Sequence, residues 1–323
     1  MTSGKNNISK INSLILKVFC ILAFCLVFCS GCQKGQEFKE SSFFAMGTLV
    51  NVTLPKAYQN ELKNLHKLIK SLSDEVTNLT AKINTGETTP LTPFVCNLLK
   101  EESRYRSLSS GRFNAGVFTL LELYGFPEGP FKNISHEEKS LALENIKKGY
   151  NLFEEGGICY AKSLGAKIDL GATAKGAIVD KGAEYLKERG ITDFIINAGG
   201  DLYASGTKNG KKWRIGVKNP FNKQGVSKVY ELSDVALATS GTYERFFTTD
   251  TGEKISHLVN ALTGVQGDRY VSLTVIAKNA EAADAFATVY FFMNEDEIKS
   301  RCIQDGTKVF AIDANGSSNT ICQ

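Results

Sequence analysis

The spacing of apolar residues predicts helices mainly in the first half of the chain and strands mainly in the second half. Residues 43–54 alternate and are rich in Val, Thr and Phe, which predicts a strand. Leu62, Leu65, Ile69, Leu72, Val76 and Leu79 recur at helical spacing and predict a helix over about 57–80. Further helices are expected near 92–109, 136–148, 173–189 and 279–293, and strands near 166–170, 193–197, 201–205, 212–218, 227–239, 254–260, 270–277 and 307–313. This order favours an α+β fold over regular βαβ alternation.

The N-terminus has the pattern of an export signal. Lys5 and Lys10 precede an apolar run over 14–29, which is followed by Ser30-Gly31-Cys32. A cysteine after small residues resembles a bacterial lipobox, although the box has cysteine in place of leucine three positions earlier. The sequence therefore predicts a lipoprotein signal peptide over 1–31, lipidation of Cys32, a polar tether over 32–42 and a domain over 43–323. An uncleaved signal anchor is the alternative.

Composition narrows the classes of function. The chain of 323 residues is 42% hydrophobic and 22% charged, as in ordinary globular proteins. Its net charge of +4 is spread along the chain without a dense basic block, so nucleic acid is not expected as a partner. Four cysteines remain after the signal segment, namely Cys96, Cys159, Cys302 and Cys322. A Cys302–Cys322 bridge and buried free thiols both fit an exported protein.

Two glycine-containing turns are candidates for ligand contact. In the first, Asp169-Leu170-Gly171 precedes a helix that begins near Thr173. Lys175, in the first turn of that helix, opposes the helix dipole, and a nearby phosphate would account for it. An exposed lysine in a routine turn is the alternative. The second turn, Asn197-Ala198-Gly199-Gly200-Asp201, permits close backbone approach, but a plain hairpin turn has the same pattern.

Two later segments carry candidate acid–base and metal chemistry. His257 lies in an apolar stretch before a turn and is the best general base available, although a lone strand histidine is often structural. His66 and His136 lie in polar helical surroundings and are expected to be solvated. Asp284 and Thr288 are four residues apart and share one face of an apolar helix. A buried aspartate needs a partner, and Mg²⁺ suits carboxylate and hydroxyl oxygens, whereas the helix dipole alone is the alternative explanation.

Together these segments resemble the FAD:protein FMN transferases, the ApbE-type flavin-trafficking family. Met46-Gly47-Thr48, Asp-Leu-Gly-Ala-x-Ala-Lys-Gly, Asn-Ala-Gly-Gly-Asp, Thr-Ser-Gly-x-Tyr-Glu-Arg and Ala-Asp-Ala-x-Ala-Thr appear in the family's order from about residue 43 onward. The resemblance implies a single α+β domain with a mixed or antiparallel sheet core and packed helices. It departs from the family where Asn260 replaces Asp, Ala261 replaces Pro and Tyr124 replaces Trp.

The resemblance also implies roles for individual residues. His257 would be the catalytic base, and Asp284, Thr288 and the carbonyl of Ala172 would hold Mg²⁺. FAD would be contacted by Met46, Tyr124, Gly125, Phe126, Asp169, Lys175, Ser240, Glu244 and Val259.

The implied reaction splits FAD. A Thr or Ser hydroxyl of a partner flavoprotein, in a motif such as Asp-x-x-Thr/Ser-Gly-Ala-Thr/Ser, would attack the phosphorus on the FMN side, and AMP would leave. The export signal and lipobox place the enzyme outside the cytoplasm, anchored to a membrane by lipid on its periplasmic face. Hydrolysis of FAD to FMN and AMP, and a lipid-anchored flavin-binding protein without turnover, are the alternatives.

Overall fold

The computed structural model describes residues 35–249, 252 and 254–323, so the predicted signal peptide and Cys32 lie outside the described residues. The α-helices are α2 (Glu61–Asn84), α3 (Pro93–Leu108), α4 (Phe118–Tyr124), α5 (His136–Lys148), α6 (Ala174–Glu188), α7 (Ala280–Phe291) and α8 (Glu295–Asp305). The strands are β1 (Phe38–Ala45), β2 (Thr48–Pro55), β3 (Thr89–Pro90), β4 (Tyr150–Glu155), β5 (Ile158–Ser163), β6 (Phe194–Ala198), β7 (Asp201–Ser205), β8 (Trp213–Asn219), β9 (Asn222–Leu232), β10 (Val235–Gly241), β11 (Phe246–Thr248), β12 (Lys254–Ser256), β13 (Tyr270–Ala277), β14 (Lys308–Asp313) and β15 (Ser318–Cys322). Among the described residues, no helix has the length and apolar character needed to cross a membrane.

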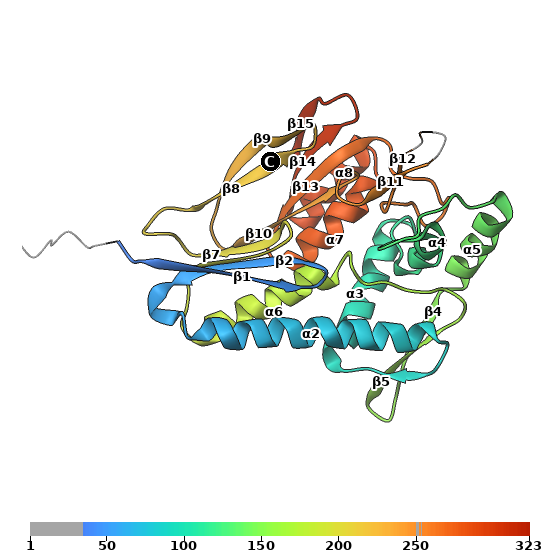
Figure 1. The fold of residues 1–323 in the computed structure, drawn as a ribbon, viewed down its shortest axis with the longest axis horizontal. Coiled ribbons are helices and arrows are strands. Elements are labelled where there is room, and N and C mark those ends of the chain that lie inside the picture. Colours follow the sequence, from blue (N-terminus) through green and yellow to red (C-terminus); the bar gives the residue numbers. More distant parts are fainter. Residues whose placement is uncertain (1–34, 250–251, 253) are drawn as a thin grey trace, which may run out of the picture. The chain divides into compact units, whose positions relative to one another are not determined.

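An eight-stranded sheet forms the centre of the compact unit from Phe38 to Gln323, within the described part of the chain. Its order is β1-β2-β6-β7-β10-β13-β14-β15, and every neighbouring pair is antiparallel. The expectation of an α+β fold with an antiparallel sheet core and packed helices is confirmed (Figure 1).

The central strands of the sheet, such as β7 and β13, are buried on both faces and are mostly apolar, whereas the edge strands β1 and β15 are partly exposed. Ala236 and Ala238 of β10 point into the main core with α2, α3, α6 and α7, whereas Leu237 points to the other face. There it meets Trp213 and Leu232 of the β8–β9 hairpin, which covers that face. The helical layer on the first face supplies most of the candidate site residues.

The strand predicted over 43–54 is wrong as a single element. The chain reverses at Met46 and Gly47, which have φ values of 53° and 67°, so β1 and β2 form a hairpin. Apolar residues lie close to the turn on both sides, and Gly47 was the sole local signal of the reversal. The hairpin also extends the domain toward the N-terminus, because Phe38 to Ser42, inside the predicted tether, pair with β2.

The strand predicted over 166–170 is also wrong, because the segment is extended without a strand partner. Side chains satisfy its backbone instead. Asn84 donates from Nδ2 to the Ile168 carbonyl at 2.9 Å and accepts from the Ile168 N–H at 2.8 Å. Thr119 pairs with both backbone groups of Lys167 in the same manner. The segment leading to Asp169 is therefore fixed by two helices.

Other boundaries differ in smaller ways. The strand predicted over 227–239 is two strands, β9 and β10, because Asp234 adopts φ 57° between them. The strand predicted over 254–260 ends at Ser256, which leaves His257 in an irregular segment. His66 was expected to be solvated, but its ring contacts that of Phe43, with the two ring centroids 3.8 Å apart. The sequence analysis did not predict β3, β4, β5, β11, β15, α4 or α8.

Two disulfides close long segments of the described chain. Cys302–Cys322 ties α8 to the last strand, which resolves the choice between a bridge and free thiols. Cys96–Cys159 links α3 to β5 across 63 residues and was not anticipated.

Candidate active site

The N-terminal ends of α6 and α7 meet, and this contact builds the candidate site. It requires glycine at position 176, because a Cβ there would lie 2.2 Å from the Ala280 carbonyl oxygen. Asp180, one turn further along α6, accepts from the N–H groups of Ala280 and Glu281 at 2.8 and 2.9 Å and so caps α7. The two helix starts are thereby held in fixed register.

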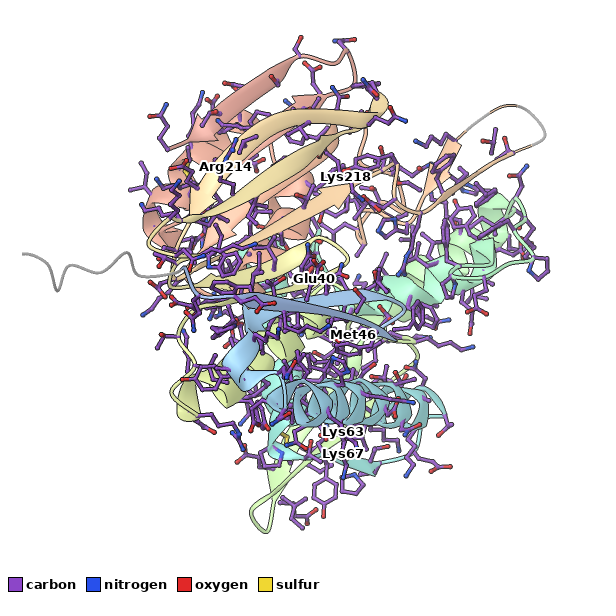
Figure 2. All side chains as sticks on the ribbon, turned by 60° about the vertical axis from the view of Figure 1, so that its left-hand side comes forward. Glu40, Met46, Lys63, Lys67, Arg214 and Lys218 are labelled. Carbon is purple, nitrogen blue, oxygen red and sulfur yellow. A yellow bond between two sulfur atoms is a disulfide. The ribbon has the colours of Figure 1, made fainter. Side chains whose placement is uncertain are left out.

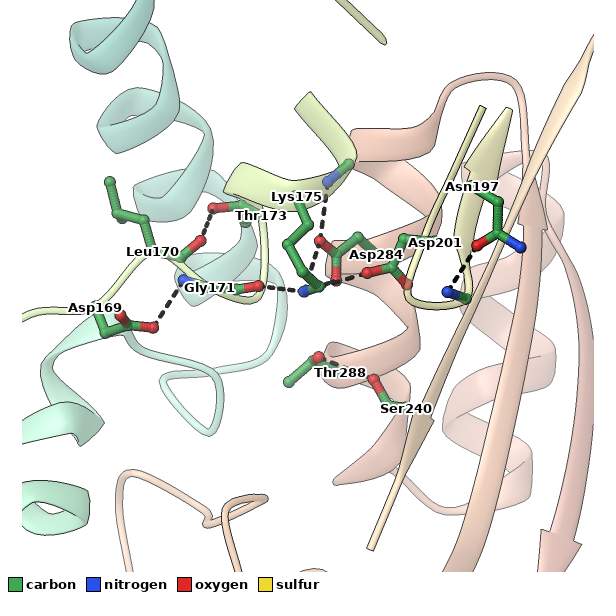
Figure 3. A network of polar contacts seen from close by, with 12 residues as sticks. Asp169, Leu170, Gly171, Thr173, Lys175, Asn197, Asp201, Ser240, Asp284 and Thr288 are labelled. Atoms are coloured by element: carbon green, nitrogen blue, oxygen red, sulfur yellow. Dashed lines mark hydrogen bonds and ion pairs between the residues drawn. The ribbon is translucent and has the colours of Figure 1, made fainter. Parts of the chain in front are cut away.

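Lys175 lies between two buried carboxylates at this junction (Figure 3). Its Nζ is 3.2 Å from Oδ2 of Asp201, at the start of β7, and 3.3 Å from Oδ2 of Asp284 on α7. Nζ also donates to the Gly171 carbonyl, and the Gly176 N–H donates to Asp284 at 3.1 Å. The helix start, the Gly171 turn and the Asn-Ala-Gly-Gly-Asp turn therefore converge on one ammonium group.

The charges of this cluster depend on one another. Burial alone lowers the pKa of Lys175, but the carboxylates of Asp201 and Asp284 raise it well above the ordinary value. Burial raises the pKa of Asp284, and the charge of Asp201 adds to the rise, whereas Lys175 opposes it. Asp284 is therefore a carboxylate that a second positive charge would favour in its ionised form.

Asp284 and Thr288 share a face of α7, as their spacing predicts. The Thr288 hydroxyl lies 3.1 Å from the hydroxyl of Ser240 on β10, so these two predicted site residues are neighbours (Figure 3). Asp169 accepts from the Gly171 N–H at 2.8 Å and shapes the turn that contains Ala172. The structure thus brings Lys175, Asp284, Thr288 and Ser240 to one region and places the turn of Asp169 and Ala172 against it.

Oxygen donors of the kind that a hard divalent cation prefers are present here. Asp284 supplies a carboxylate, Thr288 a hydroxyl, and the turn at Gly171 and Ala172 supplies backbone carbonyls. Within the described residues, no three His, Cys, Asp or Glu side chains are grouped as a metal cluster. A site that relies on hydroxyl and carbonyl oxygens would not form such a cluster, so the donor set fits Mg²⁺.

His257 is oriented by a backbone carbonyl. Its Nδ1 lies 3.1 Å from the carbonyl oxygen of Arg245, which can only accept, so Nδ1 carries the hydrogen and Nε2 is left as the acceptor. Burial, together with the charges of Arg245 and Lys175, lowers the pKa of His257 to about 4, although the hydrogen bond to the Arg245 carbonyl opposes the shift. The imidazole is therefore neutral near pH 7 and has a free lone pair.

An aromatic group lies beside α4. Phe131 and Phe247 stack with ring centroids 5.0 Å apart, and Phe126 and Tyr124 contact Phe247 at 5.8 and 6.3 Å. Gly125, with φ 94°, ends α4, and a Cβ there would lie 2.3 Å from the Pro130 carbonyl oxygen. The rings of Tyr124 and Phe126, joined through Gly125, thus belong to one aromatic cluster with Phe131 and Phe247, which the sequence analysis did not single out. Within this cluster Phe126 is buried and Phe131 is exposed.

Three further predicted site residues, Met46, Glu244 and Val259, are each positioned by neighbours of their own. Met46 is at the end of the β1–β2 hairpin and donates its N–H to Ser73 of α2 at 3.3 Å (Figure 2). Glu244 is exposed in the turn before Arg245, and a Cβ on Gly47 would lie 3.7 Å from the Arg245 guanidinium, so the hairpin and this turn are adjacent. Val259 is buried in the small core of Leu120, Ala142 and Ile146, which Tyr124 also contacts.

Asp201 is the functional candidate that sequence reasoning did not assign. Its motif was noted only as a possible ligand turn, and its carboxylate is almost fully buried. The available signal was an aspartate directly after two glycines on an apolar strand, because a buried carboxylate there needs a cation. The identity of that cation, Lys175, depends on the packing of α6 against β7.

Known proteins share this sequence and fold. A model of the ApbE family matches residues 46–311. The FAD:protein FMN transferase of Vibrio cholerae is 29% identical over 291 residues, which cover 84% of this chain and 86% of that protein. The FAD:protein FMN transferase of Rhodobacter capsulatus is 28% identical over 293 residues, which cover 86% of this chain and 56% of that protein.

Solved structures show the same architecture. The crystal structure of the ApbE protein from Thermotoga maritima has a TM-score of 0.81 and 28% identity, and the match covers 88% of this chain and 97% of that one. The flavin transferase ApbE from Vibrio cholerae has a TM-score of 0.74 and 26% identity over 88% of this chain and 96% of that one. The family match spans most of the domain, and so the chain belongs to the ApbE family.

Proposed function

We propose that this protein is a Mg²⁺-dependent FAD:protein FMN transferase, which cleaves FAD, attaches FMN to a Thr or Ser of a partner flavoprotein through a phosphoester and releases AMP. The observation that carries the proposal is the convergence of Lys175 at the start of α6 with Asp284 and the Thr288–Ser240 pair along one face of α7. Membership of the ApbE family, whose curated relatives carry this name, supports the same activity.

The charged residues of the site would bind the diphosphate and withdraw charge from it. A divalent cation held by Asp284, Thr288 and the Ala172 carbonyl would neutralise charge on the phosphate oxygens. Lys175, an ammonium at the same helix start, is suited to bind those oxygens directly. The rings of Tyr124, Phe131 and Phe247, which are at least partly exposed, offer flat apolar faces to an isoalloxazine or adenine ring. The buried Phe126, also a proposed FAD contact, packs against Phe131 and Phe247. Gly125, Met46, Asp169, Ser240, Glu244 and Val259 complete the proposed FAD contacts.

His257 would move the proton of the reaction. The acceptor hydroxyl oxygen forms a bond to the phosphorus on the FMN side, the bond between that phosphorus and the AMP oxygen breaks, and Nε2 of His257 accepts the hydroxyl proton. The Arg245 carbonyl holds Nδ1 protonated, which keeps Nε2 in the accepting tautomer. A base of this type contributes roughly 10²- to 10⁴-fold in rate.

The proposed setting is outside the cytoplasm, with Cys32 lipidated and the domain held at a membrane on its periplasmic face. Two disulfides among the described residues support an oxidising compartment. The proposed acceptor carries an Asp-x-x-Thr/Ser-Gly-Ala-Thr/Ser-like motif. Fractionation of cells after labelling with palmitate tests the location, since loss of the label in Cys32→Ser with release of the protein from membranes is expected.

Incubation of the protein with Mg²⁺, FAD and an acceptor carrying that motif tests the reaction. We expect flavin fluorescence to remain on the denatured acceptor and AMP to appear in equal amount. His257→Ala should lower AMP release by roughly 10²- to 10⁴-fold with FAD affinity nearly unchanged. Asp284→Ala should abolish AMP release and also weaken FAD binding.

Each alternative predicts a different result. Free FMN and AMP without flavin on the acceptor would indicate hydrolysis. FAD binding without AMP under any divalent cation would indicate a flavin-binding protein. Undiminished AMP release by His257→Ala would remove His257 from the role of base.

A further inference from the structure

Lys175 contacts the same carboxylate that the proposed metal site requires. Its Nζ lies 3.4 and 3.3 Å from Oδ1 and Oδ2 of Asp284, so the ammonium faces both oxygens. The Gly176 N–H also binds Oδ2, at 3.1 Å. A cation that binds Asp284 therefore meets a carboxylate that already has two donors, one of which carries a full positive charge.

Two cations on one buried carboxylate repel each other strongly. At a separation of about 4 Å, and with water largely excluded, unit charges interact several times more strongly than in bulk water. The side chain of Asp284 has only 6% of its surface exposed, so screening by solvent is weak. The ammonium of Lys175 and a divalent ion are consequently competitors for Asp284.

Asp201 gives the ammonium a second partner. Its Oδ2 is 3.2 Å from Nζ, and its side chain is 7% exposed. Asp201 begins β7, whereas Asp284 is on α7, so the two carboxylates approach Lys175 from different elements (Figure 3). A lysine side chain has four flexible bonds and can leave one carboxylate while it keeps the other.

We propose that Lys175 and the divalent cation exchange at Asp284, and that Asp201 is the positioning residue that retains the ammonium when the cation takes Asp284. The inference rests on the proposed function, because it assumes a metal at Asp284. The exchange releases from Asp284 one N–H donor of Lys175, which stays beside the metal through Asp201 and the Gly171 carbonyl, where an FAD diphosphate would be bound. Metal binding would thereby prepare the lysine for the substrate.

Titration of Mn²⁺ without FAD, followed by the electron paramagnetic resonance signal of the free ion, tests the exchange. Lys175→Met should lower the Kd for Mn²⁺ by about tenfold, because the competitor is removed. Asp201→Asn should raise it by about tenfold, because the ammonium then has only Asp284 as a partner. Lys175→Arg, which keeps the charge, should stay within about threefold of the wild type.

The double variant Lys175→Met/Asp201→Asn separates exchange from simple charge removal. If Asp201 acts through Lys175, its substitution should change the Kd at least about fivefold less in the Lys175→Met background. An equal effect of Asp201→Asn in both backgrounds would mean that its charge acts directly on the metal, and would overturn the proposal. Weaker Mn²⁺ binding in Lys175→Met would overturn it as well.

Control variants and the activity of the wild type distinguish failure of the exchange from failure of the proposed function. Lys181→Met removes an exposed charge from the same helix and should leave the Kd unchanged. If Lys175→Met does not fold, Lys175→Gln can take its place, because it also removes the charge but keeps a polar N–H donor. If the wild type releases AMP but the effect of Asp201→Asn on the Kd for Mn²⁺ does not depend on Lys175, the exchange alone is refuted. A wild type that binds no Mn²⁺ at all refutes both the exchange and the metal site.

Discussion

At the scale of single residues, burial sets the protonation of the groups that would react. His257 is held by the Arg245 carbonyl in an environment that disfavours its charged form. Its folded-state pKa of about 4 lies below the ordinary value of 6.5, so the unfolded chain binds more protons than the folded protein between these values.

This difference predicts a pH dependence of stability. As the pH falls from 6.5 toward 4, the wild type should lose up to about 3 kcal/mol of unfolding free energy relative to His257→Gln, which cannot be protonated. Urea unfolding of both proteins at pH 7 and at pH 4.5 measures the change. An equal response of the two proteins would show that the imidazole titrates normally in the folded state.

Sequence reasoning at this scale found residue types better than partners. The conflict between Lys175 and the helix dipole correctly indicated unusual surroundings, and the spacing of Asp284 and Thr288 correctly placed both on one helix face. The partners Asp201 and Ser240 come from β7 and β10, far away in sequence. No local pattern encodes which strand end lies beside a helix start.

At the scale of elements, side chains can replace a strand partner. Residues 166–170 have the composition of a strand, yet Asn84 at the end of α2 forms both backbone hydrogen bonds of Ile168. This contact fixes the chain three residues before Gly171, whose carbonyl accepts from Lys175.

Asn84→Ala is therefore expected to affect both stability and the site. Two buried backbone groups would lose their partner, at a cost of about 2–4 kcal/mol of unfolding free energy. The Kd for FAD should also rise, because the turn that carries Ala172 is released. Asn78→Ala, an exposed asparagine on the same helix, is the control and should change neither quantity. Denaturant unfolding and FAD titration provide the two measurements.

Local sequence signals predicted the ends of helices more reliably than the ends of strands. The helix expected over 136–148 matches α5 residue for residue, because Ser135 caps it and its apolar residues are periodic. The Met46–Gly47 turn was missed, since the single glycine that allows it lies between two apolar segments that together resemble a single strand.

At the scale of the whole molecule, family resemblance identified the domain and its sheet more securely than periodicity. The order of motifs implied an ApbE domain, and the family match confirms that assignment. Periodicity alone gave the α+β class but no strand order, because the pairing of β2 with β6 and of β7 with β10 joins segments separated by long insertions.

The two disulfides should contribute unequally to global stability. In the chain-entropy model, the 63-residue separation of Cys96–Cys159 contributes about 4 kcal/mol and the 20-residue separation of Cys302–Cys322 about 3 kcal/mol. Cys96→Ser/Cys159→Ser should thus unfold at a lower denaturant concentration than Cys302→Ser/Cys322→Ser. The reverse order would indicate that native packing around the bridges, and not loop closure, dominates.

Because β1 begins at Phe38, only a short segment of chain connects the sheet to Cys32. Phe38 is already paired in the sheet, so it lies only six positions after Cys32, with five residues between them. A fully extended chain of that length spans about 20 Å. With Cys32 acylated as proposed, a short tether would keep the enzyme close to the bilayer, and its acceptors would have to bring their hydroxyl groups to the enzyme there.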